Sequence, residues 1–202
     1  MSPDNEDELL AVVAFDLAWS PSGQNLAFIG ATDGPSADVY LYDRHNGSTK
    51  RLTDGPHTAG MLQWSPDGKW IVHESISRIH FMRPGGRITL AVWAAAADGS
   101  EVKKLYDFPY QENVEMEVSQ VFHGWIAEDR FVVTFESPYD PTVNRTYVVD
   151  VSKGDYVELP YYSFSYGGGA LAPISETLLL NFDSNELPQG TTRHGLYVAP
   201  LE

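Results

Sequence analysis

The chain has 202 residues, of which 43% are hydrophobic, enough for one domain with a sizeable core. Its formal net charge of −15 would repel nucleic acid and anionic membranes, so we expect neither as a general partner. The absence of cysteine excludes disulfides and thiolate chemistry, and no apolar run is long enough to span a membrane.

The chain opens with an acidic segment, residues 1–8, that lacks the basic and apolar regions of a signal peptide. We therefore expect no signal peptide or transmembrane segment in this chain, and the sequence leaves its compartment open. Residues 9–13 are apolar and form the first strand candidate, although they have no turn motif of their own.

The next strand, expected over about residues 15–19, leads into the sequence Trp19-Ser-Pro-Ser-Gly23 and then into a second apolar run. Proline presets the backbone at the second position of a type I turn, and glycine is favoured at the fourth, so this segment predicts a β-hairpin. The pattern returns as Trp64-Ser-Pro-Asp-Gly68 before another apolar run, which indicates a structural repeat. We expect Trp19 and Trp64 to occupy equivalent positions with similar surroundings.

A second hairpin follows the first in each repeat. The run Val39-Tyr-Leu-Tyr-Asp43 precedes Gly47, and the run Thr146-Tyr-Val-Val-Asp150 precedes Gly154, so both place Asp and Gly four residues apart. A short Asp-to-Gly loop between two apolar runs is typical of a tight connection between strands. Each repeat therefore predicts four short strands, the content of one β-propeller blade.

The sequence Trp-Ser-Pro-Asp-Gly-Lys, followed by Tyr-Leu-Tyr-Asp and Arg-Leu-Thr, resembles the WD40-like repeat of TolB-type β-propellers. The first two repeats match well, whereas His123-Gly-Trp-Ile-Ala-Glu-Asp-Arg130 replaces the turn in the third and residues 171–180 form a weaker fourth. The resemblance implies an all-β propeller with a scaffold role. Proteins with this repeat are often exported, so the resemblance leaves an exported, periplasmic parent protein open.

We therefore expect a single all-β domain with four blades of four antiparallel strands. The expected blades cover about residues 14–53, 58–109, 117–159 and 164–202, and residues 9–13 complete the last one. In a closed ring, residues 9–13 would pair with residues 196–199 and leave no open sheet edge. The alternative is an arc cut from a larger propeller. Residues 77–87 and 106–116 contain the extra length of the second repeat.

One basic segment stands out in this acidic chain and forms the only ligand site that we predict from the sequence. Arginine binds carboxylate or phosphate in a two-pronged geometry, and Gly85-Gly86 could let backbone amides approach an anion. The alternative is a solvated loop whose arginines pair with nearby acids. The predicted anion-binding residues are Arg78, His80, Arg83 and Arg87.

The sequence Ser165-Tyr-Gly-Gly168 resembles part of the nucleophile elbow of prolyl oligopeptidase-type hydrolases, with Asp183 and His194 following in the order of that fold. However, Ser163 occupies the position where the elbow needs glycine, and the next residues cannot open a helix. The supposed triad also spans too few residues for the elements that normally separate its members. We therefore predict no catalytic residue, and we interpret Ser165 as part of a turn at the start of a blade.

The remaining candidates have structural explanations. Aromatic residues near Ser165 favour packing between blades over a binding platform. No histidine has the spacing of a zinc ligand next to a carboxylate, and no calcium-loop pattern is present, so we expect no metal and no cofactor. The aromatic residues are Tyr161, Tyr162, Phe164 and Tyr166, and the other histidines are His45, His57, His73, His123 and His194.

The function predicted from the sequence is a non-enzymatic scaffold whose loops bind a protein or peptide partner. Two alternatives remain open: the gating propeller of a prolyl oligopeptidase-type serine peptidase whose catalytic domain lies elsewhere, and a propeller that binds a small anion or a glycan. The sequence does not indicate an oligomeric state.

Overall fold

The computed structural model describes residues 13–31, 36–55, 58–79, 87–107, 119–136, 144–159, 169–171, 177–182 and 195–200. Two compact units divide the chain, residues 1–110 and residues 111–202, and each is described by itself. All regular elements in the described residues are β-strands, and none of these residues forms a helix long and apolar enough to cross a membrane.

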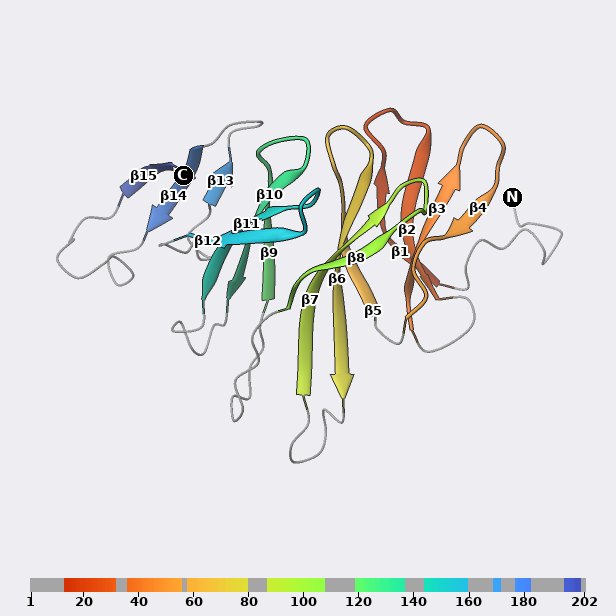
Figure 1. Cartoon of the computed structure of the whole chain (residues 1–202), viewed down its shortest axis with the longest axis horizontal. Helices are drawn as coiled ribbons and strands as arrows, with labels where there is room; N and C mark the ends of the chain where they lie inside the picture. Colours follow the sequence, from red (N-terminus) through yellow and green to blue (C-terminus); the bar gives the residue numbers. More distant parts are fainter. Residues whose placement is uncertain are drawn as a thin grey trace. The chain divides into compact units, whose positions relative to one another are not determined.

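The first unit contains two four-stranded antiparallel sheets, each with its strands in sequence order (Figure 1). The first sheet consists of β1 (Val13–Trp19), β2 (Asn25–Ala31), β3 (Asp38–Asp43) and β4 (Thr49–Arg51). The second consists of β5 (Thr58–Trp64), β6 (Trp70–Ile79), β7 (Arg87–Ala96) and β8 (Val102–Asp107).

The second unit repeats this arrangement with a third sheet of four strands and a fourth of three described strands. The third sheet consists of β9 (Ser119–Trp125), β10 (Arg130–Glu136), β11 (Arg145–Asp150) and β12 (Asp155–Glu158). The fourth consists of β13 (Gly169–Leu171), β14 (Thr177–Phe182) and β15 (Gly195–Pro200). Sheets of this kind confirm the predicted all-β, propeller-type fold class.

The two Trp-Ser-Pro turns form as their sequence predicts. The Gly23 amide donates to the Ser20 carbonyl at 2.8 Å, and the Gly68 amide donates to the Ser65 carbonyl at 2.9 Å, both glycines having a positive φ. The serine hydroxyl has a role that the sequence did not reveal. Ser65 Oγ accepts from the backbone amide of Trp70 at 2.9 Å, so a buried side chain fixes the start of the next strand.

The predicted Asp-to-Gly loops also form. The Gly47 amide donates to the Asp43 carbonyl and the Gly154 amide donates to the Asp150 carbonyl, each at 2.9 Å. The aspartate side chains cap their own loops: Asp43 Oδ1 accepts from the amide of His45, and Asp150 Oδ1 accepts from the amide of Lys153. These local bonds explain why aspartate begins both loops.

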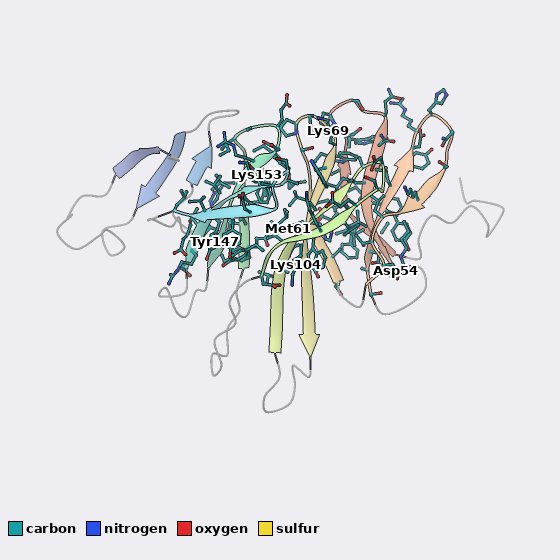
Figure 2. The ribbon with its side chains drawn as sticks, in the orientation of Figure 1. Asp54, Met61, Lys69, Lys104, Tyr147 and Lys153 are labelled. Atoms are coloured by element: carbon teal, nitrogen blue, oxygen red, sulfur yellow. The ribbon has the colours of Figure 1, made fainter. Side chains whose placement is uncertain are left out.

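A β-bulge interrupts the first strand of each four-stranded sheet. In β1 the register shifts between Phe15 and Ala18, and in β5 it shifts between Gly60 and Gln63. Asp16 in the first bulge has a φ of 51°, and Met61 in the second, labelled in Figure 2, has a φ of 53°. Left-handed backbone at two non-glycine residues in equivalent positions indicates a shared bulge that belongs to the fold.

The core of the first unit lies between its two sheets. Ile29 and Val39 from the first sheet and Ile71 from the second are fully buried there. Trp64 packs into the same cluster, and its indole Nε1 donates to the carbonyl of Ala18 in β1 at 2.8 Å. The amide of Leu62 donates to Asp16 Oδ2 at 3.0 Å, so both bulges contribute to the contact between the sheets.

The expectation for the two tryptophans is half right. Trp19 pairs with Leu26 and Trp64 pairs with Ile71 at the end of equivalent strands, so their positions match. Their surroundings differ, because Trp64 is 8% exposed whereas Trp19 is 53% exposed. The face of β1 that bears Trp19 is not the face that packs on the second sheet, and no other described sheet of this unit covers it.

Val13 does not belong to a separate closing strand. It lies in β1 and pairs with Ala31 of β2, so the start of the first sheet falls earlier than expected. Residues 9–12 lie outside the described residues, and their pairing with residues 196–199 stays a prediction, as does the arrangement of all four sheets in one domain. Part of the extra length predicted at residues 77–87 lengthens β6 and β7, which extend past the other strands of their unit (Figure 1).

We predict that Trp64→Phe lowers the free energy of unfolding by about 1–2 kcal/mol, because it removes a hydrogen bond and leaves the Ala18 carbonyl without its indole donor. The matched change Trp19→Phe removes the same atoms from an exposed ring and should alter stability by less than about 0.5 kcal/mol. Urea denaturation followed by circular dichroism measures both. Equal losses in the two variants would contradict the assigned contact.

Candidate functional site

A pocket of about 380 Å³ lies between the first and second sheets, within the first unit. In Figure 2, Asp54 marks the segment after β4 and Lys104 marks β8, the two elements at its borders. Its volume is in the range of small-ligand sites. The lining residues are Ala37, Asp38, Leu52, Thr53, Asp54, Gly55, Ala59, His73, Ser75, Trp93 and Val102.

One wall of the pocket is a hydrogen-bonded cluster centred on Asp38, which is 3% exposed. Asp38 Oδ1 accepts from the Thr53 hydroxyl at 3.0 Å and from the Gly55 amide at 3.3 Å. Asp38 Oδ2 accepts from Arg51 Nη2 at 2.7 Å, and the same nitrogen reaches Asp54 at 2.9 Å. The buried carboxylate is therefore paired on both oxygens, and this wall is held rigidly.

The opposite wall carries two polar side chains from the middle of the second sheet. His73 of β6 and Trp93 of β7 are directly opposite each other in the register, so both side chains project from the same face. His73 is 4% exposed, and its Nδ1 lies 3.1 Å from the carbonyl oxygen of Glu74. His73 Nε2 and Trp93 Nε1 are buried and have no hydrogen-bond partner.

The protonation of His73 follows from these surroundings. Burial lowers the pKa of His73, and the bond to the Glu74 carbonyl and the charge of Asp38 oppose this effect only in part. The ring is therefore neutral near pH 7. A carbonyl oxygen only accepts hydrogen bonds, so Nδ1 carries the proton and Nε2 is an acceptor.

Aspartate, histidine and serine all line this pocket, but they are not arranged as a catalytic triad. In a triad the carboxylate accepts from Nδ1 of the histidine, and Nε2 is bonded to the serine hydroxyl. Here Nδ1 of His73 faces a backbone carbonyl, and Nε2 has no partner despite the presence of Ser75 in the same pocket. The three side chains therefore do not form a catalytic triad in this pocket.

The predicted anion site lies elsewhere. Arg78 pairs with Ile88, and Arg87 pairs with Ile79, so the structure places both arginines at the ends of β6 and β7. His80 and Arg83 fall in the connecting segment, outside the described residues, as do the Ser165 segment, its aromatic neighbours, Asp183 and His194. The anion site therefore stays a prediction. Within the part of the chain that is described, no group of His, Asp and Glu side chains could hold a metal ion.

The sequence did not single out His73 or Trp93 as site residues. Neither belongs to a motif, and each lies inside an apolar strand. The sequence feature that could have indicated this site is the polar pair His73-Glu74, which follows Trp70-Ile-Val72 in a strand expected to be apolar. A charged or titratable residue at such a position needs either a partner or a role.

The chain matches no known family model. It is 25% identical over 183 residues to the uncharacterised peptidase YuxL of Bacillus subtilis (strain 168), a match that covers 91% of this chain and 24% of YuxL. The chain therefore spans about a quarter of the length of that curated relative.

Two solved structures illustrate the likeness of fold. TolB from Acinetobacter baumannii superposes with a TM-score of 0.54 and 16% identity, over 94% of this chain and 41% of TolB. The β-propeller domain of the Trilobed protease from Pyrococcus furiosus gives a TM-score of 0.58 and 13% identity, over 92% of this chain and 53% of that domain. At such identities the likeness shows the fold alone, and it confirms a TolB-like β-propeller architecture.

Glu74 follows His73 in β6, so its side chain lies on the opposite face of the strand, and its pKa is also shifted. Burial, followed by the charge of Asp16, raises the pKa of Glu74 to about 7. The folded state therefore binds more protons than the unfolded state between pH 4.5 and about 7, so the stability from this group is present below pH 4.5 and is lost as the pH rises through 7.

We predict that Glu74→Gln is more stable than the wild type at about pH 8 by up to about 3 kcal/mol, the equivalent of the pKa difference, with the gain shrinking toward about pH 5. Urea denaturation at several pH values measures it. His123 also makes the stability depend on pH, because burial lowers its pKa to about 4 and the stability from this group therefore falls in acid. The measured quantity is for this reason the difference in stability between variant and wild type at each pH. A difference that does not change with pH would contradict the assignment.

Proposed function

We propose that this chain is a non-enzymatic β-propeller scaffold that binds a protein or peptide partner. The observation that supports this function best is the pocket between the first two sheets. Its buried carboxylate is already paired, its histidine is neutral, and two of its fully buried side-chain atoms, His73 Nε2 and Trp93 Nε1, have no partner. Such a site suits recognition of a polar group, and it lacks the hydrogen-bonded nucleophile and base that catalysis needs.

The charge of this pocket also favours a neutral ligand group over an anion. Two carboxylates, Asp38 and Asp54, line the pocket, and both are bonded to the same cation, Arg51. Burial keeps His73 uncharged near pH 7, so the histidine adds no positive charge. An incoming anion would meet a net negative surface there. The proposed alternative of anion binding therefore rests on the basic segment at residues 78–87 and not on this pocket.

A second candidate function is the propeller portion of a serine peptidase. It is favoured by the match to YuxL, which is named a peptidase, and by the likeness to the propeller domain of a protease. In that case the same scaffold would serve a catalytic domain that is not among these 202 residues. Finding Gly-x-Ser-x-Gly with a downstream Asp and His in a longer reading frame would favour this candidate.

We predict that a fluorophosphonate probe labels neither Ser165 nor Ser75, because neither is expected to have an activating base. Mass spectrometry of the probe-treated chain measures the labelling, and a known serine hydrolase in the same reaction serves as the positive control. Stoichiometric labelling that disappears in Ser165→Ala or in Ser75→Ala would overturn the non-enzymatic proposal.

The scaffold function itself is tested by selecting peptides from a random display library on the folded chain and measuring their affinity by titration calorimetry. We expect enriched peptides that bind one to one with dissociation constants of about 1–100 μM, the range of a small groove without extensive burial. The heat-unfolded chain is the control for non-specific capture. Failure to enrich any peptide over this control would contradict the proposal.

A further inference from the structure

One face of the first sheet leaves two large apolar side chains of β1 in solvent. Side chains alternate between the faces of a strand, so Leu17 and Trp19 point away from Ala18, which packs on the core between the two sheets. Leu17 is 62% exposed and Trp19 is 53% exposed, and together they define the β1 face. Further across this side of the sheet, Phe28 and Tyr40 stack on each other and are buried, so its open part is the β1 face.

The equivalent residues of the second sheet, Leu62 and Trp64, are buried in the core between the two sheets. Each of them is also hydrogen-bonded to the first sheet. The amide of Leu62 donates to Asp16 Oδ2 at 3.0 Å, and Trp64 Nε1 donates to the carbonyl of Ala18 at 2.8 Å. In the second sheet these positions therefore form a docking face for another sheet.

The backbone of β1 repeats the geometry that permits this docking in β5. Leu17 falls in the register gap of the first bulge, as Leu62 falls in that of the second, so neither residue has a partner in the pairing with the next strand. Trp19 and Trp64 occupy the last paired position of their strands. The β1 face therefore carries the same two donors, an amide and an indole N–H, beside the same apolar side chains.

We propose that the β1 face docks a further propeller-type β-sheet that is not part of these 202 residues. The first strand of that sheet presents a carboxylate oxygen to the amide of Leu17 and a backbone carbonyl to Trp19 Nε1. Asp16 and Ala18 supply these two acceptors to the second sheet in the existing contact. The fitting partner is thus a protein sheet with an aspartate in the bulge of its first strand.

The other sheets of the chain do not offer this carboxylate. The residue three positions before the end of the first strand is Asp16 in the first sheet, but it is Met61 in the second and Phe122 in the third. In the fourth sheet the residue at this place in the sequence is Gly168. The required acceptor therefore points to a sheet from outside the chain.

The first test supplies such a sheet. Residues 13–57 are duplicated ahead of Val13, which keeps the 45-residue spacing between Trp19 and Trp64. We expect the indole N–H of Trp19 in the original copy to exchange at least about a hundredfold more slowly than in the unextended chain. The equivalent indole in the added copy has no sheet before it and should still exchange fast, so it is the internal control.

Two results of this test would contradict the inference. One is fast exchange of both indoles in a folded extended chain. The other is an added repeat that stays unfolded beside an intact original chain, because a single sheet needs a docking partner to be stable. If the extended chain does not fold at all, residues 13–57 are titrated as a separate synthetic peptide into the ¹⁵N-labelled wild-type chain. We then expect a saturable shift of the Trp19 indole resonance, and no shift would overturn the inference.

A matched pair of variants tests the chemistry of the partner sheet. Asp16→Ala in the added copy removes the acceptor for the Leu17 amide, whereas Asp54→Ala in the added copy removes an exposed carboxylate elsewhere. We expect Asp16→Ala to reduce the protection of the Trp19 indole at least about tenfold and Asp54→Ala to leave it unchanged. Equal effects of the two changes would show that the carboxylate is not recognised.

The unextended chain tests the other possible occupants. We expect its Trp19 indole to exchange fast at every protein concentration. Slow exchange that is independent of concentration would show that the chain covers its own β1 face, and slowing that grows with concentration would show that a second copy binds there. Either result would overturn the inference. The peptide-binding pocket lies on the opposite side of the first sheet, so the proposed function stands or falls separately, by peptide selection.

Discussion

The first unit depends on the contact that joins its two sheets at Trp64. The indole of Trp64 donates to Ala18 while the amide of Leu62 donates to Asp16, and both bonds require the bulges that turn Asp16 and Met61 into left-handed backbone. Burying the large ring against the neighbouring sheet adds the hydrophobic contribution. Because one sheet alone exposes an apolar face, each sheet needs this contact to be stable.

The pocket is built from the same pair of sheets. The amide of Ala59 in β5 donates to the carbonyl of Ala37 at 2.9 Å, so the strand that carries Trp64 also fixes the entrance to the Asp38 wall. The two walls differ, because both carboxylate oxygens of Asp38 are hydrogen-bonded whereas His73 Nε2 and Trp93 Nε1 have no partner. Unpaired buried groups lower stability, so His73 and Trp93 are retained at a cost to the fold.

Local chemistry made much of the fold predictable. Proline and glycine set the Trp-Ser-Pro turns, and aspartate and glycine set the second hairpins, because these residues determine backbone geometry within four positions. The different exposure of Trp19 and Trp64 was not predictable, since it depends on which sheet face meets a neighbour. The pocket was not predicted either, because His73 and Trp93 are brought together only by the register of β6 and β7. The sequence of one strand alone does not determine its register with the next.

The most direct test of this account is hydrogen exchange of the indole N–H groups in the ¹⁵N-labelled chain. We predict that the Trp64 indole exchanges slowly, because it is bonded to Ala18 inside the core, and that the half-exposed Trp19 indole exchanges at a rate close to that of a free peptide. Similar exchange rates for Trp19 and Trp64 would contradict the contact between the sheets on which the fold and the pocket depend.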